Sequence, residues 1–168
     1  LSSQYLVAAA LSLCMHTTIA AEIKLVCADT QREDHPVVKA LEYMASVMHD
    51  RTGNVKIVIH ANGELGRETE TLAKVRKGEL DMARLNLAIF ADSSHAVKIL
   101  TLPFLFRSKD QLWKTLQGDL GKRIDAEIGA GGLVMIGLLD SGFRSFYSTK
   151  KPIRSLSDFA GLRVRIQN

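Results

Sequence analysis

Hydrophobic and polar positions follow two different periods in the first part of the chain, and each change of period marks an expected element. Apolar side chains alternate with other residues over Ile23–Ala28 and again over Val55–His60, which is typical of β-strands. Between them, apolar residues recur at helical spacing from Pro36, which favours the first turn of a helix, to Gly53, which favours its end. The pattern therefore predicts a strand, a helix and a second strand.

The alternation of strands and helices continues after a turn-rich segment at Ala61–Gly66. Residues Arg67–Lys77 have helical spacing and are followed by Gly78, which ends the predicted helix. Asp81–Leu87 then predicts a short third strand. Because helices connect the successive strands, this order predicts a parallel sheet and a fold of the α/β class.

The middle of the chain predicts two helices and a buried strand. Lys109–Gln117 and Asp119–Ile128 have helical spacing, whereas Leu133–Leu139 is apolar throughout, which is typical of a strand buried on both faces. Thr101–Phe106 is also apolar but contains Pro103, so it predicts a buried loop or an edge rather than a central strand.

The last residues predict one further helical turn and one further strand. Leu156–Phe159 forms the turn behind a cap at Ser155 or Ser157, and Leu162–Ile166 alternates like a strand. The predicted sheet thus gains fresh strands near Asn168 without helices to cover them. We therefore interpret the sequence as the front half of a larger protein.

The first residues have the features of an export signal. Leu1–Ala20 contains no Asp, Glu, Lys or Arg, and its apolar run Tyr5–Cys14 is too short to span a bilayer as a helix. Small residues at Thr18 and Ala20 precede the first charge at Glu22. These features predict a secretory signal peptide over residues 1–20 that is cleaved after Ala20, with a buried core helix as the alternative.

Composition removes several classes of protein. The 168 residues include 46% hydrophobic and 24% charged side chains, which excludes a disordered chain and a polytopic membrane protein. Two cysteines exclude a disulfide scaffold and a four-cysteine zinc site, and Cys27 is expected to be a small buried hydrophobe. With 6% aromatic residues and no run of five basic residues, we expect no nucleic-acid partner. The net charge of +4 is compatible with arginines that face an anionic ligand.

No motif for catalysis or cofactor binding is present. None of the five histidines has a recognised zinc spacing, and there is no Gly-x-Ser-x-Gly sequence. Glycines at Gly129–Gly132 follow a predicted helix instead of preceding one, so they predict a helix stop and not a phosphate loop. The sequence therefore predicts no catalytic residue, no metal and no cofactor.

Arginines are the candidate binding groups. Arg163 and Arg165 lie on the same face of the last predicted strand, and Arg144 follows the apolar segment Leu133–Leu139. A guanidinium held by a strand offers a planar fork that matches a carboxylate. The spacing alone leaves the alternative of two solvated arginines on an edge strand.

Six short motifs occur in a fixed order and carry a family resemblance. They are Leu65-Gly66-x-x-x-Glu70, Gly78-Glu79-Leu80-Asp81-Met82, Leu102-Pro103-Phe104-Leu105-Phe106, Gly142-Phe143-Arg144-Ser145-Phe146-Tyr147, Lys151-Pro152-Ile153 and Asp158-Phe159-x-Gly161-Leu162-Arg163-Val164-Arg165. Together they resemble the DctP-type extracytoplasmic solute-binding subunits of TRAP (tripartite ATP-independent periplasmic) transporters. The resemblance covers Glu22–Asn168.

The resemblance implies a two-lobed, hinged α/β fold like that of periplasmic binding proteins, of which this sequence holds an incomplete part. Residues 21–139 would form lobe one, and residues 140–168 would form the first strands of lobe two. The hinge is expected near Leu139–Gly142.

The resemblance also implies a binding site between the lobes. Arg165 matches the arginine that grips the ligand carboxylate, and Arg144 matches an arginine that assists it. Glu68 and Asn86 match polar positions that line the first-lobe side, and Ala28–Asp29 offers a further contact. None of these roles follows from spacing alone.

The function that the resemblance implies is capture without chemistry. The protein would bind a small organic carboxylate, such as a C4-dicarboxylate or a sugar acid, in the periplasm and deliver it to the membrane subunits of a TRAP permease. It would not insert into the membrane after signal cleavage. The alternatives are a ligand-binding sensory module and an exported α/β enzyme.

Overall fold

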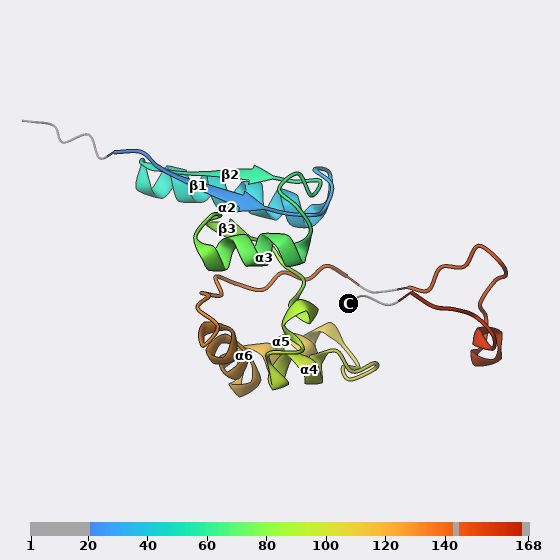
Figure 1. Ribbon diagram of the computed structural model, residues 1–168. Coiled ribbons are helices and arrows are strands. Elements are labelled where there is room, and N and C mark those ends of the chain that lie inside the picture. Colours follow the sequence, from blue (N-terminus) through green and yellow to red (C-terminus); the bar gives the residue numbers. More distant parts are fainter. Residues whose placement is uncertain (1–20, 143–144, 166–168) are drawn as a thin grey trace, which may run out of the picture.

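The computed structural model describes residues 21–142 and 145–165, so the predicted signal peptide and Arg144 lie outside the described residues. Figure 1 shows the sheet and its helices as one layer and a second group of helices beneath it. Residues 145–165 lie apart from both groups. The division into lobes at residue 139 remains a prediction. No helix in residues 21–142 or 145–165 is long and apolar enough to cross a membrane.

Three parallel strands form the sheet, in the order β2-β1-β3. They are β1 (Ile23–Ala28), β2 (Val55–His60) and the two-residue β3 (Met82–Ala83). β1 pairs with β2 along its whole length and with β3 only at its carboxyl end. The prediction of a parallel α/β sheet is confirmed.

Two helices make the crossovers between these strands, and local sequence sets their ends. Helix α2 (Pro36–Thr52) begins where the His35 imidazole Nδ1 accepts a hydrogen bond from the Val37 N–H at 3.2 Å, and it ends at Gly53 with φ 70°. Helix α3 (Glu68–Lys77) ends at Gly78 with φ 72°. Both glycines adopt the left-handed conformation that closes a helix at little steric cost. The predicted boundaries are confirmed to within one residue.

A second group of helices builds the other part of the core. It contains η2 (Leu87–Phe90, a 3-10 helix), α4 (His95–Leu100), α5 (Lys109–Gln117) and α6 (Asp119–Gly129). Ile124 of α6 is fully buried and packs with Val97 of α4 and Phe90 of η2, while Leu72 from α3 joins the same cluster. Because α3 contributes to this core, it joins the sheet layer to the lower helices (Figure 1).

A buried serine and a carboxylate attach α4 to α6. The Ser94 hydroxyl accepts from the Val97 N–H at 3.0 Å and donates to Glu127 at 2.5 Å. The same Glu127 oxygen accepts from the Ala96 N–H at 3.1 Å, and its other oxygen accepts from Arg123 at 2.9 Å. The sequence pattern predicted no element over residues 88–100, because a six-residue helix is too short to show a clear period.

Two predicted strands are wrong, and a third is shorter than predicted. Residues Leu133–Leu139 form no strand, and Val134 is 89% exposed while Leu133 packs against the core. Leu162–Ile166 is irregular over its described residues 162–165, and Asp81–Leu87 keeps only the two residues of β3. A strand needs a hydrogen-bonded neighbour, and an apolar run does not supply one.

The short turn elements agree better with prediction, except at the proline-interrupted segment. Leu156–Phe159 forms the 3-10 helix η3, and the Asp158 carboxylate accepts from the N–H of Ser155 at 2.8 Å as expected for a capped turn. Thr101–Phe106 is a loop, but it is not buried, since Phe104 is 99% exposed.

Replacing Gly121 by alanine should destabilise the fold, because an added Cβ would lie 1.7 Å from the carbonyl oxygen of Leu116. That overlap involves backbone and forces α5 and α6 apart, so we expect a loss of about 1–3 kcal/mol in the free energy of unfolding by chemical denaturation. The matched control is Gly129→Ala in the same helix, whose added Cβ meets nothing within 4 Å. It should be neutral or stabilising by up to about 1 kcal/mol; equal effects of the two would contradict the packing described.

The Glu127 tether should make stability depend on pH. The Ser94 hydroxyl, followed by the Ala96 N–H and Arg123, lowers the pKa of Glu127 to about 2 from its ordinary value of 4.5. Because the folded-state pKa is the lower one, the carboxylate stabilises the fold above about pH 4.5, and this contribution is lost as the pH falls toward 2.

We therefore expect Glu127→Gln to lower the Tm at about pH 6, with the difference from wild type shrinking between pH 4.5 and 2. Asp125→Asn is the matched control, since Asp125 lies exposed on the same helix and forms no ion pair within the described residues. A constant Tm difference across this range would show that the tether is not ionic.

Candidate ligand-binding site

The carboxyl ends of the three parallel strands meet at one edge of the sheet. Asp29 directly follows β1, Asn62 comes shortly after β2, and Arg84 directly follows β3. The chain leaves β1 for β2 on one side and later returns to β3 on the other side, so the strand order reverses between β1 and β3. Ligands of open α/β sheets bind at such a switch point, beyond the carboxyl ends of the strands.

A buried ion pair joins the two strand ends at this switch point. Arg84 donates from Nε to one Asp29 oxygen at 3.0 Å and from Nη2 to the other, so the guanidinium and carboxylate pair as a fork. The Asp29 side chain is fully buried, and the Arg84 side chain is 11% exposed. Nη2 also donates to the Thr30 hydroxyl at 3.3 Å, and the Gln31 N–H donates to Asp29 at 2.7 Å. Asp29 is therefore satisfied entirely by protein groups.

Glu68 and Asn86 join this cluster. Glu68 lies in the first turn of α3, and its Oε1 accepts from Arg84 Nη1 at 3.3 Å and from the Asn86 N–H at 3.1 Å. The Asn86 side-chain oxygen accepts from the Ala88 N–H at 3.0 Å and so caps η2. The structure thus brings together the two positions that sequence predicted for the first-lobe side. Whether they touch a ligand remains a prediction.

The charges of the cluster leave it negative. Asp29 and Glu68 are opposed by the single cation Arg84, which leaves a formal charge of −1. Burial lowers the pKa of Arg84, but the hydrogen bonds and charge of Asp29, followed by the charge of Glu68, outweigh burial and raise it. Burial, and then the charge of Asp29, raises the pKa of Cys27 to about 11, so this thiol stays neutral. Cys27 is 1% exposed, which confirms its prediction as a small buried hydrophobe.

The predicted arginine fork is not part of this cluster as described. Arg163 and Arg165 are exposed, and within residues 21–142 and 145–165 neither forms a hydrogen bond or an ion pair. Arg144 lies outside the described residues. The roles of Arg165 and Arg144 therefore remain predictions, whereas the geometry of Glu68 and Asn86 is defined.

Arg84 was not among the residues that the sequence pattern marked. The reason is that the strand was predicted to run through Leu87, which would place Arg84 in its interior. β3 in fact ends at Ala83. The available signal for the end of the strand was a charged residue, Arg84, directly after Met82 and Ala83. Its pairing with Asp29 gave no local signal, because the two residues are 55 positions apart.

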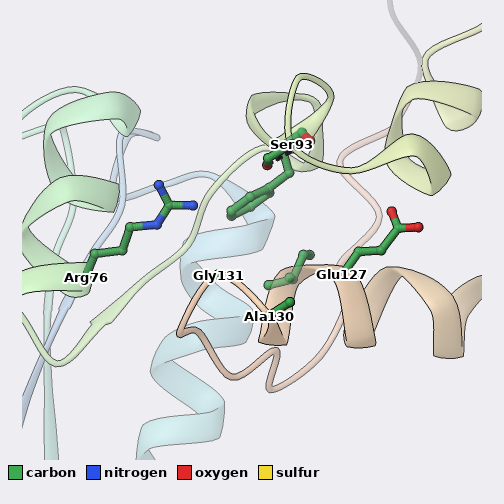
Figure 2. Close-up of a pocket in the computed structure, with 7 residues that line it drawn as sticks. Arg76, Ser93, Glu127, Ala130 and Gly131 are labelled. Atoms are coloured by element: carbon green, nitrogen blue, oxygen red, sulfur yellow. Dashed lines mark hydrogen bonds between the residues drawn. The ribbon is translucent and has the colours of Figure 1, made fainter.

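A cavity of about 250 Å³ lies elsewhere, between the end of α3 and the end of α6 (Figure 2). Glu68, Asn86 and Arg165, the predicted site residues that the structure describes, do not line it; the described lining residues are Arg76, Phe90, Ser93, Glu127, Ile128, Ala130 and Gly131. In Figure 2 the Glu127 carboxylate points away from Arg76. Among the described residues, no group of three or more His, Cys, Asp or Glu side chains could hold a metal ion.

Comparison with known proteins identifies similar chains. The family model for DctP, the bacterial extracellular solute-binding proteins of family 7, matches residues 27–168. A solute-binding protein from Chromohalobacter salexigens is 32% identical over 80% of this chain and 40% of its own length.

Two crystal structures of TRAP periplasmic solute-binding proteins are also similar. The protein from Xanthobacter autotrophicus, with bound β-D-galacturonate, is 38% identical over 80% of this chain and 45% of its own, with a TM-score of 0.75. The protein from a Bradyrhizobium species, with bound α/β-D-galacturonate, is 34% identical over 86% of this chain and 49% of its own, with a TM-score of 0.81. This chain therefore spans 40–49% of the length of these relatives, and the predicted fold class is confirmed for that part.

Replacing Arg84 by glutamine should be strongly destabilising, because it leaves the Asp29 charge buried without a cation. We expect a loss of about 3–5 kcal/mol in the free energy of unfolding, measured by denaturant titration. Arg32→Gln is the matched control, since Arg32 forms the same two-bonded fork with Asp34 on the exposed surface. Its removal should cost less than about 1 kcal/mol, and a similar cost at both sites would contradict the role given to burial.

Proposed function

Because the chain belongs to the DctP family of bacterial extracellular solute-binding proteins, as its motifs predicted, we propose that it captures a small organic carboxylate for a TRAP transporter. The match of the family over residues 27–168 is the observation that carries this proposal. The captured acid would be handed to the membrane subunits of the permease. Capture would involve no chemical change of the ligand.

The geometry at the switch point supports a ligand that carries hydroxyl groups. Glu68 offers a carboxylate oxygen and Asn86 offers a side-chain amide, side by side beyond the carboxyl ends of β1 and β3. Carboxylates and amides are suitable partners for the hydroxyl groups of a sugar. The two similar structures hold galacturonate, which has both a carboxylate and several hydroxyl groups. A sugar acid therefore fits the proposal better than a plain dicarboxylate.

The carboxylate of the ligand needs a cation, which the negative cluster cannot supply. Arg165, assisted by Arg144, would provide it through a two-bonded fork. One charge-assisted hydrogen bond contributes about 1.5–3 kcal/mol, whereas micromolar affinity requires about 8 kcal/mol. Several contacts must therefore act together, which is achieved when the two lobes close around the ligand and both touch it.

The proposal also places the protein outside the cytoplasm. The family consists of extracellular solute-binding proteins, and the similar structures are described as periplasmic. Export would use residues 1–20 as a signal peptide that is cleaved after Ala20. The mature protein would then meet the permease from the periplasmic side without inserting into the membrane itself.

Arg165→Ala in the full-length protein should abolish binding of D-galacturonate, because the ligand carboxylate would lose its two-bonded partner. Isothermal titration calorimetry measures this, and we expect affinity to fall by at least about 100-fold. Arg163→Ala is the matched control, since Arg163 is also an exposed arginine and lies two residues away. Unchanged affinity after Arg165→Ala would remove this residue from the site, and failure of the wild type to bind any organic acid would refute the proposed function.

A further inference from the structure

We propose that Arg84 is a positioning residue that holds Glu68 as a hydroxyl acceptor, and that the net negative charge of the Asp29–Arg84–Glu68 cluster excludes ligands with a second carboxylate. This inference rests on the proposed function and narrows its ligand class. It concerns a residue that the sequence motifs do not mark, and it follows from the contacts of that residue.

The contacts of Arg84 leave it little capacity to bind a ligand directly. A guanidinium has five N–H donors. Nε and Nη2 are used by Asp29, Nη2 also by Thr30, and Nη1 by Glu68. The side chain is 11% exposed. Arg84 is therefore committed to protein groups and acts on a ligand only through them.

The two carboxylate oxygens of Glu68 differ in their contacts. Oε1 accepts both from Arg84 and from the Asn86 N–H, which fixes the plane and direction of the carboxylate. Oε2 accepts no hydrogen bond within residues 21–142 and 145–165, and the side chain is 21% exposed. A carboxylate held on one oxygen with the other free is ready to accept a hydroxyl group without reorganising.

The balance of charge then selects the ligand. Two carboxylates face one guanidinium, so the cluster has a net charge of −1 beside the free oxygen of Glu68. A ligand hydroxyl can donate to this oxygen, whereas a second ligand carboxylate has no proton to donate and meets a like charge. The site should therefore accept an acid with hydroxyl groups, such as a hexuronate, and reject a C4-dicarboxylate.

A double-mutant cycle in the full-length protein tests this inference by calorimetry with D-galacturonate and succinate as probes. The first change, Glu68→Gln, removes the acceptor charge. The second change, Asp29→Asn together with Arg84→Gln, replaces the buried pair by neutral amides so that no charge is left buried and unpaired. The control replaces the exposed pair, Arg32→Gln with Asp34→Asn, and should leave both affinities unchanged.

We expect the wild type to bind D-galacturonate about 100-fold more tightly than succinate. Each of the two changes should weaken galacturonate binding by about 10-fold and thereby lower the ratio of galacturonate affinity to succinate affinity. In the Glu68→Gln background, the paired change at residues 29 and 84 should cost less than about 2-fold, because Arg84 acts through Glu68. General damage to the fold would instead weaken binding equally in both backgrounds.

Equal losses in both backgrounds, no loss from the paired change, or tighter binding of succinate than of galacturonate would each overturn the inference. These outcomes are separate from failure of the proposed function. If galacturonate binding depends on Arg165 but the effects of the two changes add, only the proposed role of Arg84 is refuted and the proposed function stands. If the wild type binds neither probe nor any other organic acid, both proposals are wrong.

Discussion

The buried ion pair between Asp29 and Arg84 is the constraint on which the candidate site depends. The Asp29 side chain has no exposed surface, and a lone charge in that position would be strongly disfavoured. Arg84 supplies the cation from the end of β3 and so ties β3 to β1 where the strand order reverses. Its remaining nitrogen reaches Glu68, and the first turn of α3 is thereby held against the same strand ends. One side chain therefore sets the geometry of three elements.

The candidate site, held by this ion pair, and the cavity described above lie at different places in the described part of the chain. The cavity lies between α3 and α6 and is lined partly by Glu127, one oxygen of which holds the start of α4 while the other accepts from Arg123. The switch point gathers charged and polar groups at the carboxyl ends of parallel strands. Ligands of open α/β sheets bind beyond the carboxyl ends of the strands, where the strand order reverses, and the cavity does not lie at that point.

The charge of the chain as a whole is a poor guide to the charge of the site. The net charge is +4, which favoured arginines that face an anion. The cluster at the switch point is instead negative, because its one arginine, Arg84, pairs with the two carboxylates of Asp29 and Glu68. Under the proposed function, a carboxylate ligand would therefore need its cation from another segment, and this cluster would meet the uncharged, hydroxyl-bearing end of such a ligand.

The sequence by itself determined the elements whose signals are local. The strands at Ile23–Ala28 and Val55–His60 and the helix ends at Gly53 and Gly78 follow from side-chain period and from the backbone freedom of glycine, which act within a few residues. The motif order likewise pointed to the family and to Glu68 and Asn86. The strand predicted at Leu133–Leu139 does not form, because an apolar run by itself does not show whether a hydrogen-bonding neighbour exists.

Only the tertiary structure decided what Asp29 pairs with and which groups surround Glu68. Asp29 and Arg84 are separated by 55 residues, and they meet because β1 and β3 are neighbours in the sheet although β2 lies between them in sequence. No local pattern encodes that adjacency. The pairing of Asp29 with Arg84 follows from burial, because a charge in the protein interior is tolerated only where folding brings its counter-charge to the same point.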